Sequence, residues 1–364
     1  MKQQARVMSS QYMQWAKGHA HVKYNLANSG LTNYPLSDLP LKLDDIELTG
    51  NSYYGYEPLL EAIAKRYNVA TNKIFSTLGT SFANYMVMAV LYEPDAEILI
   101  EQPTYELLKS TAEYVGYKIN RFQRRFENKF QIDLDEIKKT ITSKTKLIVL
   151  TNLHNPSSVF TSDDTLKEIG RIAQSIGAYV LVDEVYLDSA FSLSPRSSIH
   201  LGDEFIVTNS LTKVYGLSGL RCGWVFAMPE LIQKMWHLND LFYVVQQHPA
   251  EILSVIAMNN LERITAWSRS ILENNHQTIN NFIQSRTELE TIRPGYGTVI
   301  FPRLKRGSIE PLLKLLYDKY QTVITPGRFF DMPEFFRIGL GLNPESFKTG
   351  IENLSKAIDE LSGK

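Results

Sequence analysis

The sequence contains a single cysteine, Cys222, among its 364 residues. No disulfide framework can form within one chain, which disfavours a small secreted scaffold. Charge of one sign is also missing: 38 lysines and arginines face 39 aspartates and glutamates, giving a formal net charge of −1. Nucleic acids and anionic membranes attract clearly basic surfaces, so this balance disfavours both partners and favours a small-molecule substrate.

Long apolar runs are absent as well. The run MVMAVLY at Met86–Tyr92 is far shorter than the roughly 20 residues of a membrane helix. The first 25 residues contain no apolar core of a signal peptide. We therefore expect a cytoplasmic protein. His19 and His21 have no third ligand nearby, and no cysteine–histidine cluster has the spacing of a metal site, so we expect no metal.

Several nucleotide and hydrolase signatures are missing too. No glycine is followed by Lys-Ser or Lys-Thr at the spacing of a Walker phosphate loop, and Gly216, Gly219 and Gly223 do not open a dinucleotide-binding turn. ATP and NAD are therefore disfavoured as cofactors. Serine hydrolase chemistry has no support either, because no Gly-x-Ser-x-Gly elbow is present.

What the chain does contain is a series of short, unbroken apolar runs. Runs of this kind are typical of strands buried on both faces of a mostly parallel sheet. Helical segments such as DTLKEIGRIAQSIG separate several of them, and alternating strands and helices predict a doubly wound α/β domain. The four runs are AEILIEQP (Ala96–Pro103), KLIVLTN (Lys146–Asn152), YVLVDEVY (Tyr179–Tyr186) and EFIVTNS (Glu204–Ser210).

The last third of the chain has a different pattern. From roughly Leu253 it predicts a long helix, then short strands in TVIFPRL and FRIGLGL, and a final helix in FKTGIENLSKAIDEL. We interpret this as a smaller α+β lobe. The predicted organisation is an N-terminal segment (1–45) packing with the small lobe, a large domain (46–252) and a small domain (253–364).

Each predicted strand is followed by a polar cluster at its carboxyl end. In open parallel sheets, ligands bind in the crevice at those ends, so four separate segments should deliver side chains to one place. The clusters are Pro103-Thr104-Tyr105, Asn152 to Pro156, Asp183 to Tyr186, and Ser210 to Lys213.

Two further features favour a phosphate at this edge. Gly79-Thr80-Ser81 opens a predicted helix, whose free backbone N–H groups and dipole favour an anion. Ser210 could add a hydroxyl, and Arg221 a guanidinium suited to bidentate phosphate contact.

Together these residues resemble the fold-type-I pyridoxal-phosphate enzymes, specifically the class I/II aminotransferases. The resemblance runs from about Tyr54 to Gly339. Its most specific part is Ser210-Leu-Thr-Lys213 followed by GLSGLRCGW. It is similar to the family's Schiff-base lysine segment, in which a serine precedes the lysine by three residues and an arginine follows it by eight.

The resemblance implies a role for each residue around a pyridoxal 5′-phosphate cofactor. Lys213 would be the catalytic lysine that holds the cofactor covalently. Asn155 and Tyr186 would contact the phenolic oxygen, Asp183 would face the pyridine nitrogen, and Tyr105 would stack on the ring. Gly79, Thr80, Ser81, Ser210 and Arg221 would bind the phosphate.

Three further residues are matched by the resemblance, and a fourth, His154, is a candidate by its position alone. Arg337 in FRIGLG resembles the arginine that holds the substrate's α-carboxylate, and Gly30 resembles a glycine whose backbone lies near that carboxylate. Tyr54 resembles the tyrosine that reaches the phosphate of a neighbouring subunit, although adjacent Tyr53 could be its equivalent. His154 could approach the substrate or be structural.

The sequence also departs from the family pattern. After Asn155-Pro156 the family usually continues with Thr-Gly or Ser-Gly, whereas this chain has Ser157-Ser158. A residue at 158 with positive φ would be strained without glycine. Phe82 stands where an acidic residue is frequent.

Physical chemistry gives these residues their expected functions. A lysine nucleophile must be neutral, so burial and nearby cations should lower the pKa of Lys213 from its usual ~10.4. The released amine can then move a proton on the substrate. Asp183 would keep the pyridine nitrogen protonated by placing an opposite charge beside it.

We therefore expect a homodimeric aminotransferase that moves an amino group between an L-amino acid and a 2-oxo acid. The first alternative is another reaction on the same cofactor, by a β-lyase, decarboxylase or cyclase. The second is a non-catalytic regulator that binds the cofactor. It is disfavoured because only about 50 residues precede the fold, without a helix-turn-helix pattern or basic charge.

Overall fold

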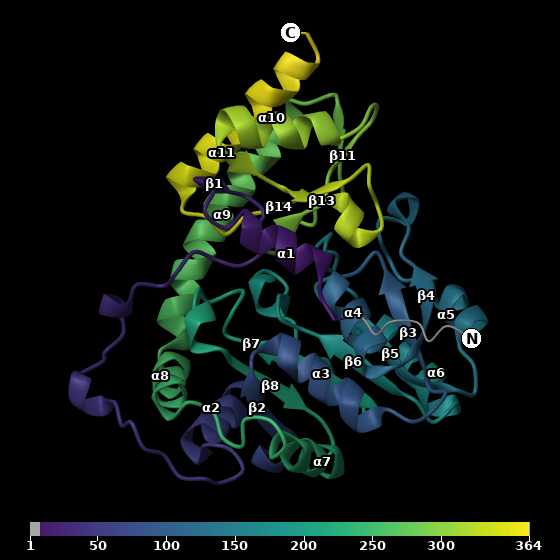
Figure 1. Ribbon diagram of the computed structural model, residues 1–364, viewed down its shortest axis with the longest axis vertical. Coiled ribbons are helices and arrows are strands. Elements are labelled where there is room, and N and C mark those ends of the chain that lie inside the picture. The colour runs from purple at the N-terminus through teal and green to yellow at the C-terminus, as the bar shows by residue number, and fades with distance from the viewer. Residues whose placement is uncertain (1–7, 364) are drawn as a thin grey trace.

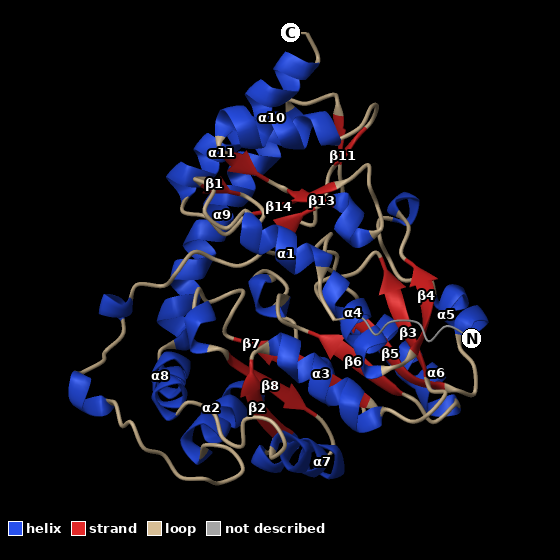
Figure 2. Ribbon diagram, in the orientation of Figure 1, coloured by secondary structure: helices blue, strands red, loops and turns tan. Residues whose placement is uncertain are grey.

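A seven-stranded sheet lies at the centre of the computed structural model, which describes residues 8–363 (Figure 2). Its strand order is β2-β8-β7-β6-β5-β3-β4. All neighbouring pairs are parallel except those made by β8, which runs antiparallel to β2 and β7. The strands are β2 (Ile74–Leu78), β3 (Glu97–Gln102), β4 (Lys118–Gln123), β5 (Thr145–Thr151), β6 (Tyr179–Asp183), β7 (Phe205–Ser210) and β8 (Cys222–Phe226).

The four predicted apolar runs form β7, β6, β5 and β3, which are neighbours in the sheet in that order. The edge strand β4 lies beside β3, and the β8–β2 pair lies beside β7. Their central residues have no exposed surface, as the unbroken apolar pattern predicts. The three remaining strands were not predicted. β4 lies at the sheet edge and carries polar, partly exposed side chains, so its sequence KINRFQ lacks an apolar run.

Helices cover both faces of this sheet (Figure 1). Met86, Leu108 and Ile232, on α3, α4 and α7, belong to one apolar cluster, whereas Ile137 and Leu166, on α5 and α6, belong to another. The predicted doubly wound α/β architecture is thereby confirmed. The helices are α2 (Glu57–Tyr67), α3 (Thr80–Leu91), α4 (Glu106–Val115), α5 (Leu134–Thr140), α6 (Asp163–Ser175), α7 (Pro229–Asn239) and α8 (His248–Asn259).

The C-terminal third forms a second cluster of elements above the sheet in Figure 1. Its strands form small sheets: β10, β14 and β13 pair antiparallel, as do β11 and β9, and β12 pairs parallel with β1 of the N-terminal segment. The elements are α9 (Leu261–Gln284), β9 (Leu289–Glu290), β10 (Val299–Ile300), β11 (Arg303–Leu304), α10 (Glu310–Tyr320), β12 (Thr322–Val323), β13 (Thr325–Pro326), β14 (Phe336–Gly339) and α11 (Pro344–Leu361).

The N-terminal segment packs into this C-terminal core. β1 (Tyr24–Asn25) pairs with β12, and Leu26 and Leu31 belong to the same apolar cluster as Phe336. Helix α1 (Gln11–Gly18) lies between the large sheet and the C-terminal elements (Figure 1). Residues 1–7 of the predicted N-terminal segment lie outside the described residues, and the divisions at 45 and 252 stay predictions.

The long helix expected from Leu253 is corrected by the structure. Two helices, α8 and α9, occupy this stretch, and the first begins at His248. Asn260 separates them: its backbone N–H donates to the Ala257 carbonyl and its Nδ2 to the Ile256 carbonyl at 2.8 Å. An asparagine that satisfies the last carbonyls of one helix in this way ends that helix.

Short 3-10 turns complete the fold, at Leu36–Asp38, Leu43–Asp45, Thr71–Lys73, Phe126–Asn128, Leu187–Ser189, Ser198–His200, Ser218–Leu220 and Gly327–Phe330. Among residues 8–363, no helix combines the length and apolar character needed to cross a membrane. The same residues contain no group of three or more His, Cys, Asp or Glu side chains that could hold a metal ion.

Candidate active site

A cavity of about 460 Å³ opens at the carboxyl edge of the central strands, in the size range of small-ligand sites. Residues after β3, β5, β6 and β7 line it, together with the start of α3. Because β8 runs antiparallel to its neighbours, Arg221 just before it reaches the same edge. The predicted site residues on its surface are Thr80, Ser81, Tyr105, Asn155, Asp183, Tyr186, Ser210, Lys213 and Arg221.

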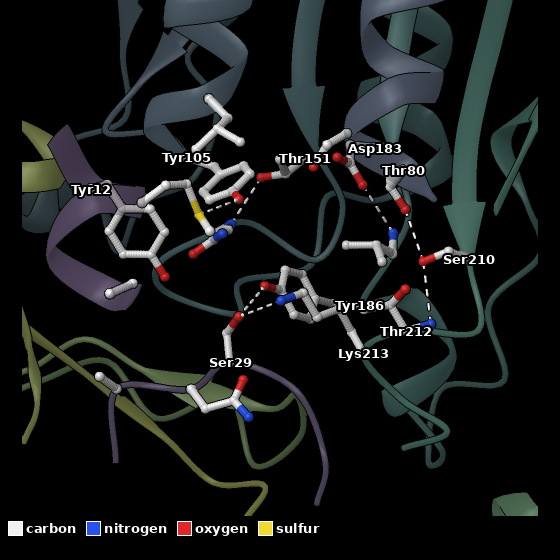
Figure 3. A pocket seen from close by; sticks show the side chains of 18 of the residues that line it. Tyr12, Ser29, Thr80, Tyr105, Thr151, Asp183, Tyr186, Ser210, Thr212 and Lys213 are labelled. Atoms are coloured by element: carbon white, nitrogen blue, oxygen red, sulfur yellow. Dashed lines mark hydrogen bonds between the residues drawn. The ribbon is translucent and has the colours of Figure 1, made fainter. Parts of the chain in front are cut away.

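Lys213 projects into this cavity from the loop after β7 (Figure 3). Its Nζ donates to the Ser29 hydroxyl at 3.0 Å, and the Tyr186 hydroxyl donates to the same oxygen at 2.8 Å. Burial lowers the pKa of Lys213 to about 8, with the positive charges of Arg337 and Arg221 adding to the effect. A lysine with this pKa is partly neutral near neutral pH, as a nucleophile requires.

Asp183, the last residue of β6, lies across the cavity from the lysine loop (Figure 3). One carboxylate oxygen accepts from Asn84 Nδ2 at 2.9 Å and the other from the Val185 backbone N–H at 3.1 Å. Asn84 is held in turn by the Thr208 hydroxyl at 2.8 Å. Burial raises the pKa of Asp183 to about 6, despite these hydrogen bonds. A cationic ring nitrogen at this place would therefore be strongly favoured.

The start of α3 forms an anion-binding corner of the cavity. Gly79 precedes the helix with φ 81°, and the Thr80 hydroxyl donates to the Ser210 hydroxyl at 2.9 Å. Arg221 lies so close that a Cβ on Gly79 would stand 2.6 Å from its Nη2. The positive φ favours glycine here, and a side chain at this position would also displace the arginine. Helix N–H groups, two hydroxyls and a guanidinium together suit a phosphate.

Arg337 does not line the cavity but lies directly behind it. The side chain is fully buried on β14. Its Nη1 donates to Asn155 Oδ1 at 3.0 Å, and its Nη2 donates to the Tyr12 hydroxyl at 2.9 Å and to the Ala27 carbonyl at 3.1 Å. Asn155 and Tyr12 both line the cavity, so they stand between the guanidinium and the space that a ligand would fill.

The remaining predicted residues are placed differently from one another. Gly30 packs against the lysine, since a Cβ there would lie 3.3 Å from Lys213 Cδ. Tyr54 is not among the residues that line this cavity: it is 53% exposed and donates to Asp240 at 3.0 Å. Tyr53 is 74% exposed. Neither tyrosine reaches the Lys213 cavity within one chain.

His154, whose role the sequence leaves open, and the single cysteine Cys222 are both buried. His154 is fully buried, with one ring nitrogen 2.6 Å from the Ser157 hydroxyl and the other 2.9 Å from the Pro103 carbonyl. Both nitrogens are therefore engaged within the protein. Cys222 is also buried, and burial raises its thiol pKa to about 12, which leaves it a poor nucleophile.

The departure at position 158 coincides with a left-handed backbone conformation. Ser158 has φ 59°, the region that glycine would occupy at least cost. Its hydroxyl donates to the Val299 carbonyl at 2.7 Å. The serine thus ties the turn after Asn155 to β10, a contact that glycine could not make. Phe82, the other departure, packs with Tyr85 and Phe242.

The sequence did not predict several cavity residues, among them Asn84, Ser29 and Tyr12. Asn84 had a usable signal, because it is the one amide inside the apolar helix stretch NYMVMAVL and lies four residues after Thr80. Ser29 had none beyond its place next to Gly30. Tyr12 lies in a polar, unremarkable N-terminal stretch, and only the tertiary structure brings it to Arg337.

The fold and this arrangement define the aspartate aminotransferase fold of type I. A crystal structure described as a pyridoxal-phosphate-dependent aminotransferase from Streptococcus suis superposes with a TM-score of 0.92 at 25% identity, covering 98% of this chain and 99% of that one. A crystal structure of the pyridoxal-phosphate-dependent cyclase OrfR superposes with a TM-score of 0.87 at 20% identity, covering 99% of each chain.

The sequence comparison gives the family. The family model for class I and II aminotransferases matches residues 47–354, and the chain belongs to this family. Capreomycidine synthase of Streptomyces vinaceus is 24% identical, with 92% of this chain and 90% of the relative covered. Aspartate aminotransferase of Bacillus subtilis is 21% identical, with 85% and 83% covered. Relatives at this distance thus include both aminotransferases and a synthase.

Proposed function

We propose that this protein is a pyridoxal-phosphate-dependent aminotransferase that moves an amino group between an L-amino acid and a 2-oxo acid. One observation carries the proposal: Lys213, with its pKa lowered to about 8, shares a cavity with the buried carboxylate of Asp183. Perturbed ionisable groups facing each other in a cavity are typical of catalytic sites. The family membership supports the same reading.

The residues present fit the cofactor. Arg221, Thr80 and Ser210 form an anion corner of the cavity. Asp183, which accepts from Asn84 one turn after Thr80 on α3, offers a carboxylate in the same cavity. Pyridoxal phosphate, when bound, supplies an electron-withdrawing ring that stabilises negative charge developing on the substrate's Cα. Asp183 would hold a proton on the ring nitrogen. Asn155 and Tyr186 would hydrogen-bond the phenolic oxygen, and Tyr105 would stack on the ring.

Lys213 would act twice. It would first hold the cofactor covalently through Nζ, for which its lowered pKa supplies the neutral amine. Displaced by the substrate, the same amine would move the proton at the substrate's Cα. Ser29 accepts a hydrogen bond from Nζ at 3.0 Å and would keep the free amine inside the cavity during this step.

Arg337 would provide the charge that recognises the substrate's α-carboxylate, as its planar guanidinium suits. Its buried position next to Asn155 would link carboxylate recognition to the residue that contacts the cofactor. Gly30, packed against Lys213, would let the N-terminal backbone approach the same place.

The proposed assembly is a homodimer in the cytoplasm. Tyr54, or its neighbour Tyr53, is exposed and would reach the phosphate site of the other subunit. Leu241 and Phe242, on the segment that follows α7, are 78% and 49% exposed. Apolar side chains exposed in this way support the proposal that a second subunit covers this surface.

A second candidate is cyclisation of an amino-acid side chain on the same cofactor. The similarity to capreomycidine synthase along 92% of this chain favours it. The two reactions share the same cofactor-binding residues, so product analysis has to separate them.

The test uses the full chain reconstituted with pyridoxal phosphate. A panel of L-amino acids is mixed with pyruvate or 2-oxoglutarate, and both products are quantified. Transamination predicts a new amino acid and a new 2-oxo acid in equal amounts, and none of either with Lys213→Ala. Release of ammonia, carbon dioxide or a cyclic amino acid without transfer to the acceptor would contradict transamination and favour the corresponding alternative.

A further inference from the structure

Helix α1 forms one wall of the Lys213 cavity, through Tyr12, Met13, Trp15 and Ala16. Ser10 caps the helix by accepting from the Met13 backbone N–H at 3.0 Å, and its hydroxyl also bonds Glu106 at the start of α4. The Trp15 ring packs on Phe329 from the C-terminal elements, with ring centroids 5.5 Å apart. The helix therefore touches both the large-sheet side and the C-terminal side of the cavity (Figure 1).

The hydroxyl of Tyr12 is an acceptor in its bond with Arg337, and its proton can still be donated. It accepts from Arg337 Nη2 at 2.9 Å, so its own proton is not used in that bond. Tyr12 lines the cavity, whereas Arg337 behind it has no exposed surface. A hydroxyl held by a guanidinium and open to a cavity donates best to an anion on the cavity side.

The walls that the α1 stretch adds contain no Asp, Glu, Lys or Arg; the titratable residue among them is His19, whose ring stacks on Trp15 and whose Nδ1 lies 2.7 Å from the Trp15 carbonyl. Among the described residues, the charged side chains that line the cavity are Asp183, Lys213 and Arg221, all assigned above to the cofactor. The α1 stretch and Leu107 supply an apolar face beyond the cofactor site, made by Met13, Trp15, Ala16, Ala20 and Leu107. The polar lining residues beside it, His19, Asn25 and Asn28, bear no carboxylate, ammonium or guanidinium. A second carboxylate or an ammonium buried against this apolar face would meet no oppositely charged Lys, Arg, Asp or Glu side chain there, and burying it would cost free energy.

We infer that helix α1 completes the amino-acid site: Tyr12 donates to the substrate's α-carboxylate in front of Arg337, and the apolar face around Trp15 selects an uncharged, apolar or aromatic side chain. This inference rests on the proposed function for the existence of an amino-acid substrate. It adds Tyr12 as a substrate-binding residue and names the substrate class.

The first test is Tyr12→Phe in the holoenzyme, read by the change in cofactor absorbance as ligand is added. The half-saturating concentration of L-phenylalanine should rise about tenfold, the effect of losing one hydrogen bond to a charged group. The half-saturating concentration of 2-phenylethylamine, which lacks the carboxylate, should not change. It is measured from the absorbance change directly or by competition with L-phenylalanine. Tyr34→Phe, outside the cavity, is the matched control and should leave both values unchanged.

Other outcomes of this test would overturn the role of Tyr12. Equal changes for both ligands would make Tyr12 a general structural residue. Tighter binding of L-phenylalanine by Tyr12→Phe would mean that the hydroxyl blocks the carboxylate site.

The second test compares side chains. The half-saturating concentrations of L-phenylalanine and L-leucine should be at least tenfold lower than those of L-aspartate and L-arginine. In Trp15→Ala the ratio between these concentrations should be smaller. Preference for L-aspartate or L-arginine would overturn the proposed substrate class. Because absorbance reports binding and product analysis reports the reaction, a protein that binds L-phenylalanine but transfers no amino group would contradict the proposed function alone.

Discussion

Two of the places where this molecule holds charged side chains away from water are built in opposite ways. Under the sheet edge, Arg124 and Glu101 are both buried and form an ion pair at 2.8 Å. Arg124 Nε also donates to the Phe130 carbonyl at 2.7 Å, while the second oxygen of Glu101 accepts from the backbone N–H and hydroxyl of Thr151, each at 2.7 Å. Protein partners thus meet the needs of both charges.

In the cavity, Lys213 and Asp183 receive only uncharged partners. Lys213 bonds a serine hydroxyl, and Asp183 accepts from an amide and a backbone N–H. Burial accordingly moves both pKa values toward the neutral range, to about 8 and about 6. In this comparison the chain saturates the charges of the Arg124–Glu101 pair, whereas the two cavity charges proposed to serve chemistry are left for a ligand to complete.

The largest effect is expected from breaking the saturated pair. Arg124→Met should lower the free energy of unfolding by about 3–5 kcal/mol, because it leaves Glu101 buried without its cation. Urea unfolding followed by circular dichroism measures this. Arg125→Met is the matched control: its ion pair with Glu136 is exposed, so the change should be within about 0.5 kcal/mol. If both variants lowered the unfolding free energy equally, the buried pair would not be the stabilising feature described above.

The same replacement in the cavity should have the opposite sign. Lys213→Met should raise the unfolding free energy of the cofactor-free protein by about 1–2 kcal/mol at pH 7. The folded-state pKa of Lys213, about 8, lies below its unfolded value, so the charged lysine destabilises the fold below pH 8. That penalty disappears as pH rises toward 10. A loss of stability at pH 7 would mean that the lysine is paired more strongly than described.

Cofactor capture by the free protein should follow the titration of Lys213. The rate of colour formation with pyridoxal phosphate should rise about tenfold between pH 7 and pH 9, because the neutral amine fraction rises through a pKa of about 8. Stopped-flow absorbance measures the rate. Continued increase beyond pH 10 would indicate an ordinary exposed lysine.

The smallest effect is expected at Asp183. Asp183→Asn should raise the stability of the cofactor-free protein by about 1 kcal/mol above pH 6, since the folded-state pKa of about 6 exceeds the unfolded value and the ionised carboxylate costs free energy there. The gain is modest because an amide replaces only one of the two acceptors used by Asn84 and Val185. Below pH 4 it should vanish, and thermal unfolding at both pH values checks this.

Much of the fold could be predicted because local pattern and tertiary environment agree. The runs that became β3, β5, β6 and β7 are apolar throughout because both faces of the sheet are covered. β4 was missed because an edge strand needs no apolar run, and the break at Asn260 because one asparagine inside a helical pattern is a weak signal.

The candidate site was predictable where its residues follow strand ends. Chain order and the rule that parallel strands end at one edge predict that Lys213, Asp183 and Asn155 lie together, whereas their roles came from the resemblance to the family. Tyr12 and Ser29 were not predictable, since they reach the cavity from the N-terminal segment through long-range packing that no local pattern encodes. Placing Arg337 behind Tyr12 likewise required the tertiary structure.

The antiparallel strand β8 fixes the length of the lysine loop. β7 and β8 form a hairpin in which Ser210 lies opposite Gly223, so Lys213 and Arg221 are both held in the loop between them. The N-terminal segment fastens this loop, through the Leu31 N–H to the Lys213 carbonyl and the Tyr34 N–H to the Gly216 carbonyl. Inserting or deleting a single residue between 214 and 220 would therefore move the lysine and the arginine apart, so this loop should tolerate substitutions far better than changes in length.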